Sequence, residues 1–228
     1  MLAAMKIRLA STALALLALP GLAAAQQAGE MQPTKSLTVT LPAMPPAPNA
    51  QGVIEDLVKV ELQTEKGRIV LALDRGRAPI TAKNFLRYVE AGRFDGQTFY
   101  RAMPYGDTGL IQGGVTDDIR KLYPPIAHEP TDETGLSHKA GTISMGHVGA
   151  GTARADFFIL LGDMIGLDAS DDPGMDPVGF AAFGHVVEGM DVVKAIFEQP
   201  IDPSKGEGAM KGQMLAKPVK IVKARTVK

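Results

Sequence analysis

The residues best placed to do chemistry in this chain are a lone arginine between aromatic neighbours and a glutamine downstream of it. Phe99-Tyr100-Arg101 is followed eleven residues later by Gln112-Gly113-Gly114. If the first stretch is extended, strand periodicity places the arginine side chain on one face of a sheet. A guanidinium keeps its charge and presents its donors in a rigid plane, so Arg101 is a candidate for a fixed cationic donor. Taken alone, an arginine in such a position usually just lies on a solvated face.

A second group is the run Ala155-Asp156-Phe157-Phe158-Ile159. In an extended segment the two phenylalanines point to opposite faces. We expect Phe157 to fill the interior and Phe158 to face an outer site. Considered in isolation, Phe158 could also be ordinary core.

Several other chemistries are disfavoured. The chain has no cysteine, which excludes disulfides and thiolate catalysis. Its four histidines show no metal-ligand spacing, and the acidic run from Asp168 to Asp176 does not fit a calcium loop, so no metal or other cofactor is expected. Ser137-His138 and Ser144 with His147 lack a Gly-x-Ser-x-Gly turn, which argues against a hydrolase. The formal net charge of -1 gives no reason to expect a nucleic-acid partner.

The N-terminal region predicts export. Lys6 and Arg8 precede an apolar stretch from Leu9 to Leu19, and Ala23-Ala24-Ala25 offers small residues for cleavage before Gln26. The apolar stretch is too short to span a bilayer comfortably, so we predict a signal peptide over 1–25 and no stable membrane anchor. Proline-rich residues 26–56 are expected to form a tether, and 57–228 the folded domain. The protein is predicted to be periplasmic or secreted, and monomeric.

Short alternating segments indicate a mostly β domain. Apolar and polar residues alternate over 58–62 and 69–73, which predicts a hairpin, and again over 219–227. Further strands are expected at 98–103, 110–112, 142–145, 157–161 and 180–187. The spacing predicts helices from Pro79 to Gly92 and from Met190 to Glu198, with long loops over 123–136 and 164–179. Many short strands with two helices favour a barrel or a sandwich.

The motifs in their order and spacing resemble the cyclophilins, the family of peptidyl-prolyl cis-trans isomerases. The resemblance covers about Val58 to Val227 and includes Gly141-Thr142-Ile143-Ser144-Met145, Phe183-Gly184-His185 and Glu188-Gly189-Met190-Asp191-Val192-Val193. It implies a closed eight-stranded antiparallel barrel capped by two α-helices, with substrate in a groove on the outer wall. It also implies isomerisation of Xaa–Pro bonds in proline-containing peptides and in unfolded or partly folded proteins, with no cofactor.

The resemblance also implies roles for individual residues. Arg101 matches the catalytic arginine, Gln112 the glutamine that orients it, and Phe158 and Leu167 the proline pocket. Further substrate-binding candidates by the same matching are Leu110, Gly146, His147, Asp156 and Phe180. Outside this context His147 would be a surface-loop histidine.

Four departures from the family pattern leave other interpretations open. About three extra residues separate Pro104 from Gln112, and Gly109 replaces a pocket phenylalanine whose space Tyr105 could fill by folding back. Asp156 stands where glutamine is usual, where it could either hold Arg101 in an ion pair or compete for it. Gly166 and Phe180 replace a rim aromatic and a histidine or tyrosine, which predicts weak cyclosporin binding. The alternatives are a proline-peptide binding module or chaperone with a degraded pocket, or a barrel repurposed for an unrelated small ligand.

Overall fold

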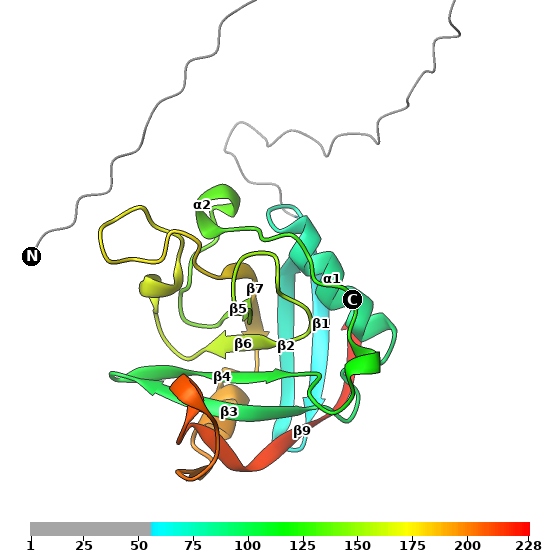
Figure 1. Cartoon of the computed structure of the whole chain (residues 1–228). Coiled ribbons are helices and arrows are strands. Elements are labelled where there is room, and N and C mark those ends of the chain that lie inside the picture. Colours follow the sequence, from blue (N-terminus) through cyan, green and yellow to red (C-terminus); the bar gives the residue numbers. More distant parts are fainter. Residues whose placement is uncertain (1–55) are drawn as a thin grey trace, which may run out of the picture. The chain divides into compact units, whose positions relative to one another are not determined.

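The computed structural model describes residues 56–228, whose arrangement is shown in Figure 1. The predicted signal peptide, and the predicted tether apart from Asp56, lie outside the described residues. Both therefore stay predictions.

Short strands dominate the described part of the chain. They are β1 (Leu57–Thr64), β2 (Gly67–Asp74), β3 (Thr98–Tyr105), β4 (Thr108–Gly114), β5 (Thr142–Met145), β6 (Phe157–Leu160), β7 (Ala181–Glu188), β8 (Ile201–Asp202) and β9 (Met214–Val227). The strands expected from alternation are all present. The last begins at Met214, before the predicted start, because Met214 pairs with Arg101 of β3 and Leu215 with Ile201 of β8.

Antiparallel pairing closes these strands into a ring. The order is β1-β2-β7-β5-β6-β4-β3-β9, and β9 pairs back onto β1, while the two residues of β8 lie beside β9. At the closing seam, Glu61 of β1 lies 2.6 Å from both Arg68 of β2 and Arg225 of β9. Closure leaves no long unpaired edge in the barrel. The predicted eight-stranded antiparallel barrel is confirmed.

The two predicted helices are present as α1 (Pro79–Glu90) and α3 (Met190–Phe197). Helix α1 packs against β2, β7 and β9, whereas α3 packs against β2, β3 and β4. A third helix, the single turn α2 (Thr131–Thr134), interrupts the segment predicted as a loop over 123–136. Three 3₁₀ turns, η1 (Ile119–Lys121), η2 (Ile165–Leu167) and η3 (Gly208–Met210), complete the described elements.

The loop that contains α2 is tied down by a carboxylate. Glu129 is buried and accepts hydrogen bonds from the backbone N–H groups of Ile80 (3.0 Å) and Thr81 (2.7 Å) at the start of α1. Helix α1 has proline at its first position and no side-chain cap of its own, so Glu129 satisfies N–H groups that would otherwise lack acceptors. The loop is thus part of the folded body.

Aromatic rings fill the barrel interior. Phe157 is fully buried, with ring centroids 5.2 Å from Phe85, 5.5 Å from Phe94 and 5.6 Å from Phe99. Phe85 comes from α1 and Phe99 from β3, so this cluster joins a helix to the sheet. The expectation that Phe157 faces the interior is confirmed by its burial.

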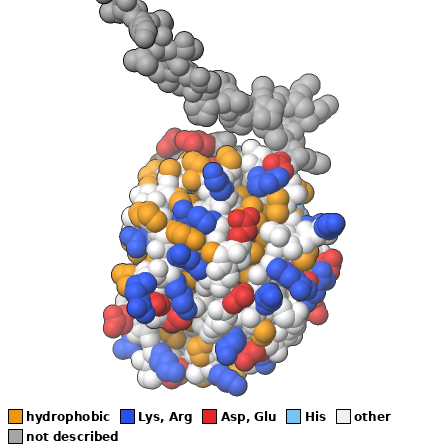
Figure 2. All heavy atoms as spheres, turned by 90° about the vertical axis from the view of Figure 1, so that its right-hand side faces the viewer, with side chains coloured by type: hydrophobic (Ala, Val, Ile, Leu, Met, Phe, Trp, Pro, Cys, Tyr) orange, Lys and Arg blue, Asp and Glu red, His pale blue; other side chains and the backbone are white. Residues whose placement is uncertain are grey.

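The surface carries mixed charges on the face shown in Figure 2, where Lys and Arg side chains alternate with Asp and Glu and neither sign gathers into a continuous patch. Within residues 56–228, no helix is both long enough and apolar enough to cross a bilayer.

Candidate active site

Three neighbouring strands carry the key candidate side chains. Arg101 of β3 is directly opposite Gln112 of β4, and Gln112 is directly opposite Phe158 of β6. Side chains directly opposite each other in a sheet point to the same face. The register therefore aligns a cation, an amide and an aromatic ring in one row on the outer wall.

A β-bulge turns Arg101 outward. The pairing register of β3 shifts between Phe99 and Arg101, toward both β4 and β9. In a regular strand, two residues separated by one position share a face, which would place Arg101 in the interior beside fully buried Phe99. The extra residue reverses the alternation, so that Phe99 and Ala102 are buried while Tyr100 and Arg101 are part-buried on the outside.

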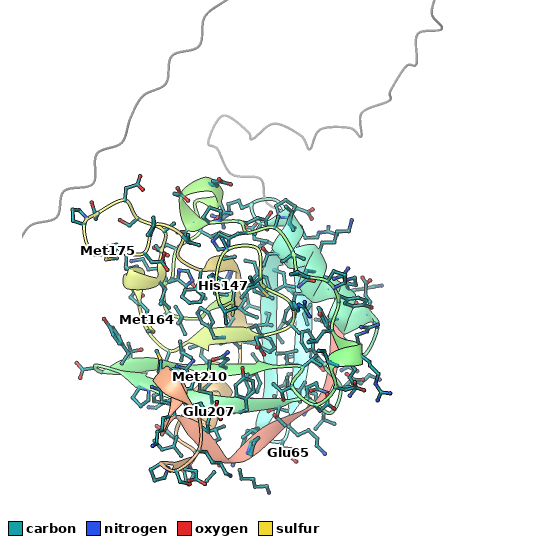
Figure 3. All side chains as sticks on the ribbon, in the orientation of Figure 1. Glu65, His147, Met164, Met175, Glu207 and Met210 are labelled. Atoms are coloured by element: carbon teal, nitrogen blue, oxygen red, sulfur yellow. The ribbon has the colours of Figure 1, made fainter. Side chains whose placement is uncertain are left out.

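The row lies along a cavity of ≈ 200 Å³. Its lining contains every predicted site residue except Asp156, together with Met103 and Met210, neither of which was predicted: Arg101, Met103, Leu110, Gln112, Gly146, His147, Phe158, Leu167, Phe180 and Met210. Figure 3 labels two of these side chains, His147 near β6 and Met210 in front of β3 and β4 in that view.

The cavity has an apolar floor that is separate from the barrel core. Leu110, Phe158, Leu160 and Met164 form their own buried cluster, against which Met103, Leu167 and Phe180 pack. The ring of Phe180 meets the ring of Phe158 edge-on, with centroids 5.4 Å apart. Phe158 and Leu110 therefore belong to an outer cluster and not to the interior that Phe157 fills.

His147 forms one wall of the cavity. Its ring stacks on Phe180 with centroids 4.5 Å apart. The N–H of Gly149 donates to Nδ1 at 3.0 Å, so the ring proton is on Nε2, which lies 2.9 Å from the carbonyl oxygen of Gly179. Burial lowers the pKa of His147. The histidine is thus a neutral, fixed wall residue.

The Arg101 guanidinium is held by neutral acceptors. Nη1 donates to Oε1 of Gln112 at 2.7 Å, Nε and Nη2 donate to Oε1 of Gln213 at 2.9 and 2.5 Å, and Nη2 lies 3.1 Å from the sulfur of Met103. No carboxylate is within ion-pair distance of Arg101 in the described structure. Burial lowers the pKa of Arg101, although a guanidinium keeps its charge in proteins.

Asp156 neither pairs with Arg101 nor lines the main cavity. Its Oδ1 accepts a hydrogen bond from the Tyr100 hydroxyl at 3.3 Å, and its side chain lines an adjoining cavity of ≈ 180 Å³. The two cavities share Gln112, Gly146, His147 and Met210. Burial raises the pKa of Asp156 to about 6, and the hydrogen bond from Tyr100 opposes that shift. The ion pair considered from the sequence is not formed.

Replacing Asp156 by asparagine is expected to stabilise the protein above neutral pH. Because the folded-state pKa of this carboxyl is about 6, above the ordinary value of 3.8, ionisation is harder in the folded chain than in the unfolded chain. The loss of wild-type stability caused by ionising Asp156 is small below pH 4, grows between pH 4 and 6, and reaches its full size above pH 6. Urea unfolding of both proteins from pH 4 to 8 should show a stability gain for Asp156→Asn that grows from pH 4 to about pH 6 and then levels off. A gain of equal size at every pH would contradict the assignment.

The structure shows how the chain accommodates the extra residues before Gln112 and the glycines at 109 and 166. The extra residues before Gln112 lengthen the β3–β4 hairpin, and Tyr105 near its tip is 61% exposed, so it does not fold back. A Cβ at Gly109 would collide with the Met103 carbonyl and the ring of Phe197 from α3, so glycine here admits Phe197 and leaves no gap. Gly166 is exposed, and Met175 is the nearest side chain to the position its Cβ would take. The rim is open there.

A serine, a histidine and an aspartate do meet nearby, but they form a structural network. His138 Nδ1 lies 2.5 Å from Asp168, and its Nε2 lies 2.9 Å from the Ser144 hydroxyl. Both Ser144 and His138 are fully buried, so no substrate can reach the hydroxyl. Asp168 directly follows Leu167, and the network therefore fixes the segment that presents Leu167 to the cavity. Residues 56–228 contain no cluster of His, Asp or Glu suited to hold a metal ion.

Three residues of this site were missed from the sequence. Met103 could have been predicted from the sequence, because it lies two positions after Arg101 and alternation in β3 places both side chains on one face. Met210 and Gln213 carry no such signal. They come from the glycine-rich segment between β8 and β9, more than a hundred residues from Arg101, and only the fold brings them there.

Comparison with protein families settles the relationship of this chain. A family model described as cyclophilin type peptidyl-prolyl cis-trans isomerase/CLD matches residues 58–226. The chain belongs to the cyclophilin family. The cavity on the outer wall of the barrel is therefore the candidate active site of a cyclophilin.

Curated relatives and solved structures agree with this cyclophilin assignment. The chain is 38% identical over 141 residues to peptidyl-prolyl cis-trans isomerase A of Dickeya dadantii, covering 60% of this chain and 70% of that protein. It is 38% identical over 151 residues to isomerase cyp18 of Streptomyces antibioticus, covering 64% and 87%. A cyclophilin crystal structure from Cryptosporidium parvum matches with a TM-score of 0.59 at 18% identity, over 76% of this chain and 99% of that one. A second Cryptosporidium structure, obtained in the presence of the dipeptide Ala-Pro, has a TM-score of 0.58.

Proposed function

We propose that this protein is a peptidyl-prolyl cis-trans isomerase in which Arg101 stabilises the twisted amide above an apolar proline pocket. Rotation about an Xaa–Pro bond breaks amide resonance and has a barrier of about 18–20 kcal/mol. In the twisted state the prolyl nitrogen becomes pyramidal and regains its lone pair. A cationic donor beside that nitrogen binds the twisted form more tightly than either planar form, which is all that catalysis requires.

The observation that supports this proposal most strongly is the row formed by Arg101, Gln112 and Phe158. It combines one cation, held by neutral acceptors, with an apolar floor in the same ≈ 200 Å³ cavity. A proline ring on Phe158 and Leu110 would bring its nitrogen toward the guanidinium. The oxygen of Gln112 faces Arg101, and we propose that its amide N–H₂ group donates to the substrate backbone.

The substrates we propose are Xaa–Pro bonds in unfolded or partly folded proteins. The second cavity of ≈ 180 Å³ adjoins the first, which supports binding of an extended peptide and not of a single proline. A solved relative was studied with the dipeptide Ala-Pro, so an Ala-Pro peptide is the natural first probe. The test is cis-to-trans relaxation of such a peptide with the full chain. Absence of acceleration would remove the isomerase proposal.

A binding module is the alternative that one observation favours, namely the open rim at Gly166. The chain contains no tryptophan, so Gly166→Trp would introduce a single tryptophan beside the cavity. We expect this variant to bind an Ala-Pro peptide and cyclosporin several-fold more tightly, because a partly buried aromatic side chain contributes a fraction of the about 1.5–3 kcal/mol that full burial provides. Isothermal titration calorimetry on the wild type and the variant measures both affinities, with a peptide that has alanine in place of proline as control. Wild-type binding without rate acceleration would support the module.

We also propose that the mature protein is exported, starting at Gln26. The charged start, the apolar stretch and the small residues before Gln26 support this. N-terminal sequencing of protein recovered from the periplasm or medium tests it, and an intact Met1 would contradict it.

A further inference from the structure

The segment between β8 and β9 lies next to β3, the strand that carries Arg101, and contains none of the residues predicted for the site. It covers residues 203–213, includes η3, and enters β9 at Met214. Met214 is the pairing partner of Arg101, and the N–H of Ala102 donates to the carbonyl oxygen of Gln213 at 3.0 Å. The backbone of Gln213 is therefore fixed next to Arg101.

The Gln213 side chain receives two hydrogen bonds from one edge of the Arg101 guanidinium. Its Oε1 accepts from Nε at 2.9 Å and from Nη2 at 2.5 Å. Gln112 accepts from Nη1 on the other side, and the sulfur of Met103 lies against Nη2. A guanidinium has five N–H groups, so only one, on Nη1, has no acceptor among the described residues.

The orientation of the Gln213 amide is itself fixed. Nε2 of Gln213 donates to the carbonyl oxygen of Ala209, four residues earlier, at 3.0 Å. With the nitrogen so engaged, the oxygen must face the guanidinium. An amide oxygen is also neutral, so it restrains the cation without cancelling the charge that the reaction uses.

We propose that Gln213 is a positioning residue that holds the Arg101 guanidinium in its productive plane and leaves one Nη1 N–H for the prolyl nitrogen. This inference rests on the proposed isomerase function. It gives the β8–β9 segment a role in the reaction. This role is indicated neither by the sequence motifs nor by the row formed by Arg101, Gln112 and Phe158.

The test compares two glutamines in the full chain. Gln213→Met keeps the side-chain length and removes the acceptor. Gln199→Met is the matched control, because Gln199 is also half-buried and also donates its Nε2 to the carbonyl four residues earlier, but it does not contact Arg101. Exchange spectroscopy of an Ala-Pro peptide gives kcat at saturation, and titration gives Kd. We expect kcat to fall about tenfold in Gln213→Met with Kd within about twofold, and no change in Gln199→Met.

A double variant separates positioning from a structural effect. If Gln213 acts only through Arg101, adding Gln213→Met to Arg101→Ala should lower the residual rate no further. Thermal unfolding temperatures of Gln213→Met and Gln199→Met equal to that of the wild type exclude misfolding. Gln213→Ala also removes the acceptor and should behave like Gln213→Met.

Two failures can be told apart. An unchanged kcat in both Gln213 variants, with Arg101→Ala inactive, overturns the role of Gln213 alone. Equal losses on adding Gln213→Met with and without Arg101 overturn it as well. No catalysis by the wild-type chain, or an unaffected rate in Arg101→Ala, overturns the proposed function itself.

Discussion

Replacing Arg101 by alanine is expected to lower the catalysed rate of Xaa–Pro isomerisation by about a hundredfold or more while changing peptide affinity by less than about threefold. In the proposed mechanism the guanidinium interacts most strongly with the pyramidal nitrogen, which exists only in the transition state. The apolar floor, to which we assign the binding of the proline ring, is untouched. Relaxation kinetics and peptide titration on the same variant measure the two effects separately.

Lysine at position 101 is the sharper version of this experiment. An ammonium keeps the charge but lacks the planar fork that fits Gln112 and Gln213 at the same time. We therefore expect Arg101→Lys to be almost as slow as the alanine variant. Arg120→Ala is the control, because that side chain is 87% exposed and, among residues 56–228, pairs only with Asp118. A fully active lysine variant would show that charge alone suffices and would contradict the proposed geometry.

Replacing Phe157 by alanine is expected to reduce the free energy of unfolding by about 3–5 kcal/mol. The ring is fully buried and contacts Phe85, Phe94 and Phe99, so its removal leaves a cavity that solvent cannot fill. Such a loss is a large part of the total stability of a typical domain. Urea denaturation provides the measurement, with Phe157→Leu, expected to cost about 1–2 kcal/mol, as a variant that remains folded.

The neighbouring residue provides the contrast. Phe158 faces the outer cluster and borders the cavity, so Phe158→Ala opens space to solvent and should cost less stability than Phe157→Ala. It should instead weaken peptide binding, because the floor of the proposed proline pocket is lost. Equal stability losses with unchanged peptide affinity would contradict the assignment of these two rings to opposite faces.

Much of the fold follows from local patterns in the sequence. Alternation over 58–62 and 69–73 was enough to predict the first hairpin, because one face of each strand is buried. Pro79 and Gly92 marked the limits of α1 for local steric reasons. Closure of the barrel was predicted only through the family resemblance, since pairing between β1 and β9 joins residues more than 150 positions apart.

Most of the site was predicted through the family resemblance and not from local patterns. Gln112 and Phe158 were matched to the family motifs in this way, and the structure then shows them in one register with Arg101 across β3, β4 and β6. The bulge at Tyr100 was not predictable, since nothing in Phe99-Tyr100-Arg101 breaks the alternation. Gln213 and Phe197 were missed for another reason. Gln213 contacts Arg101 and Phe197 packs against Gly109, and both contacts join residues far apart in the sequence.

The place of β9 in the ring ties closure of the barrel to a single strand. The strand pairs with β1 on one side and with β3 on the other, and its pairing with β1 joins residues more than 150 positions apart. Contacts of such long sequence separation form slowly, because a long loop must be closed before they can contribute. We therefore expect the seam between β1 and β9 to be among the last parts of the barrel to form when the protein refolds.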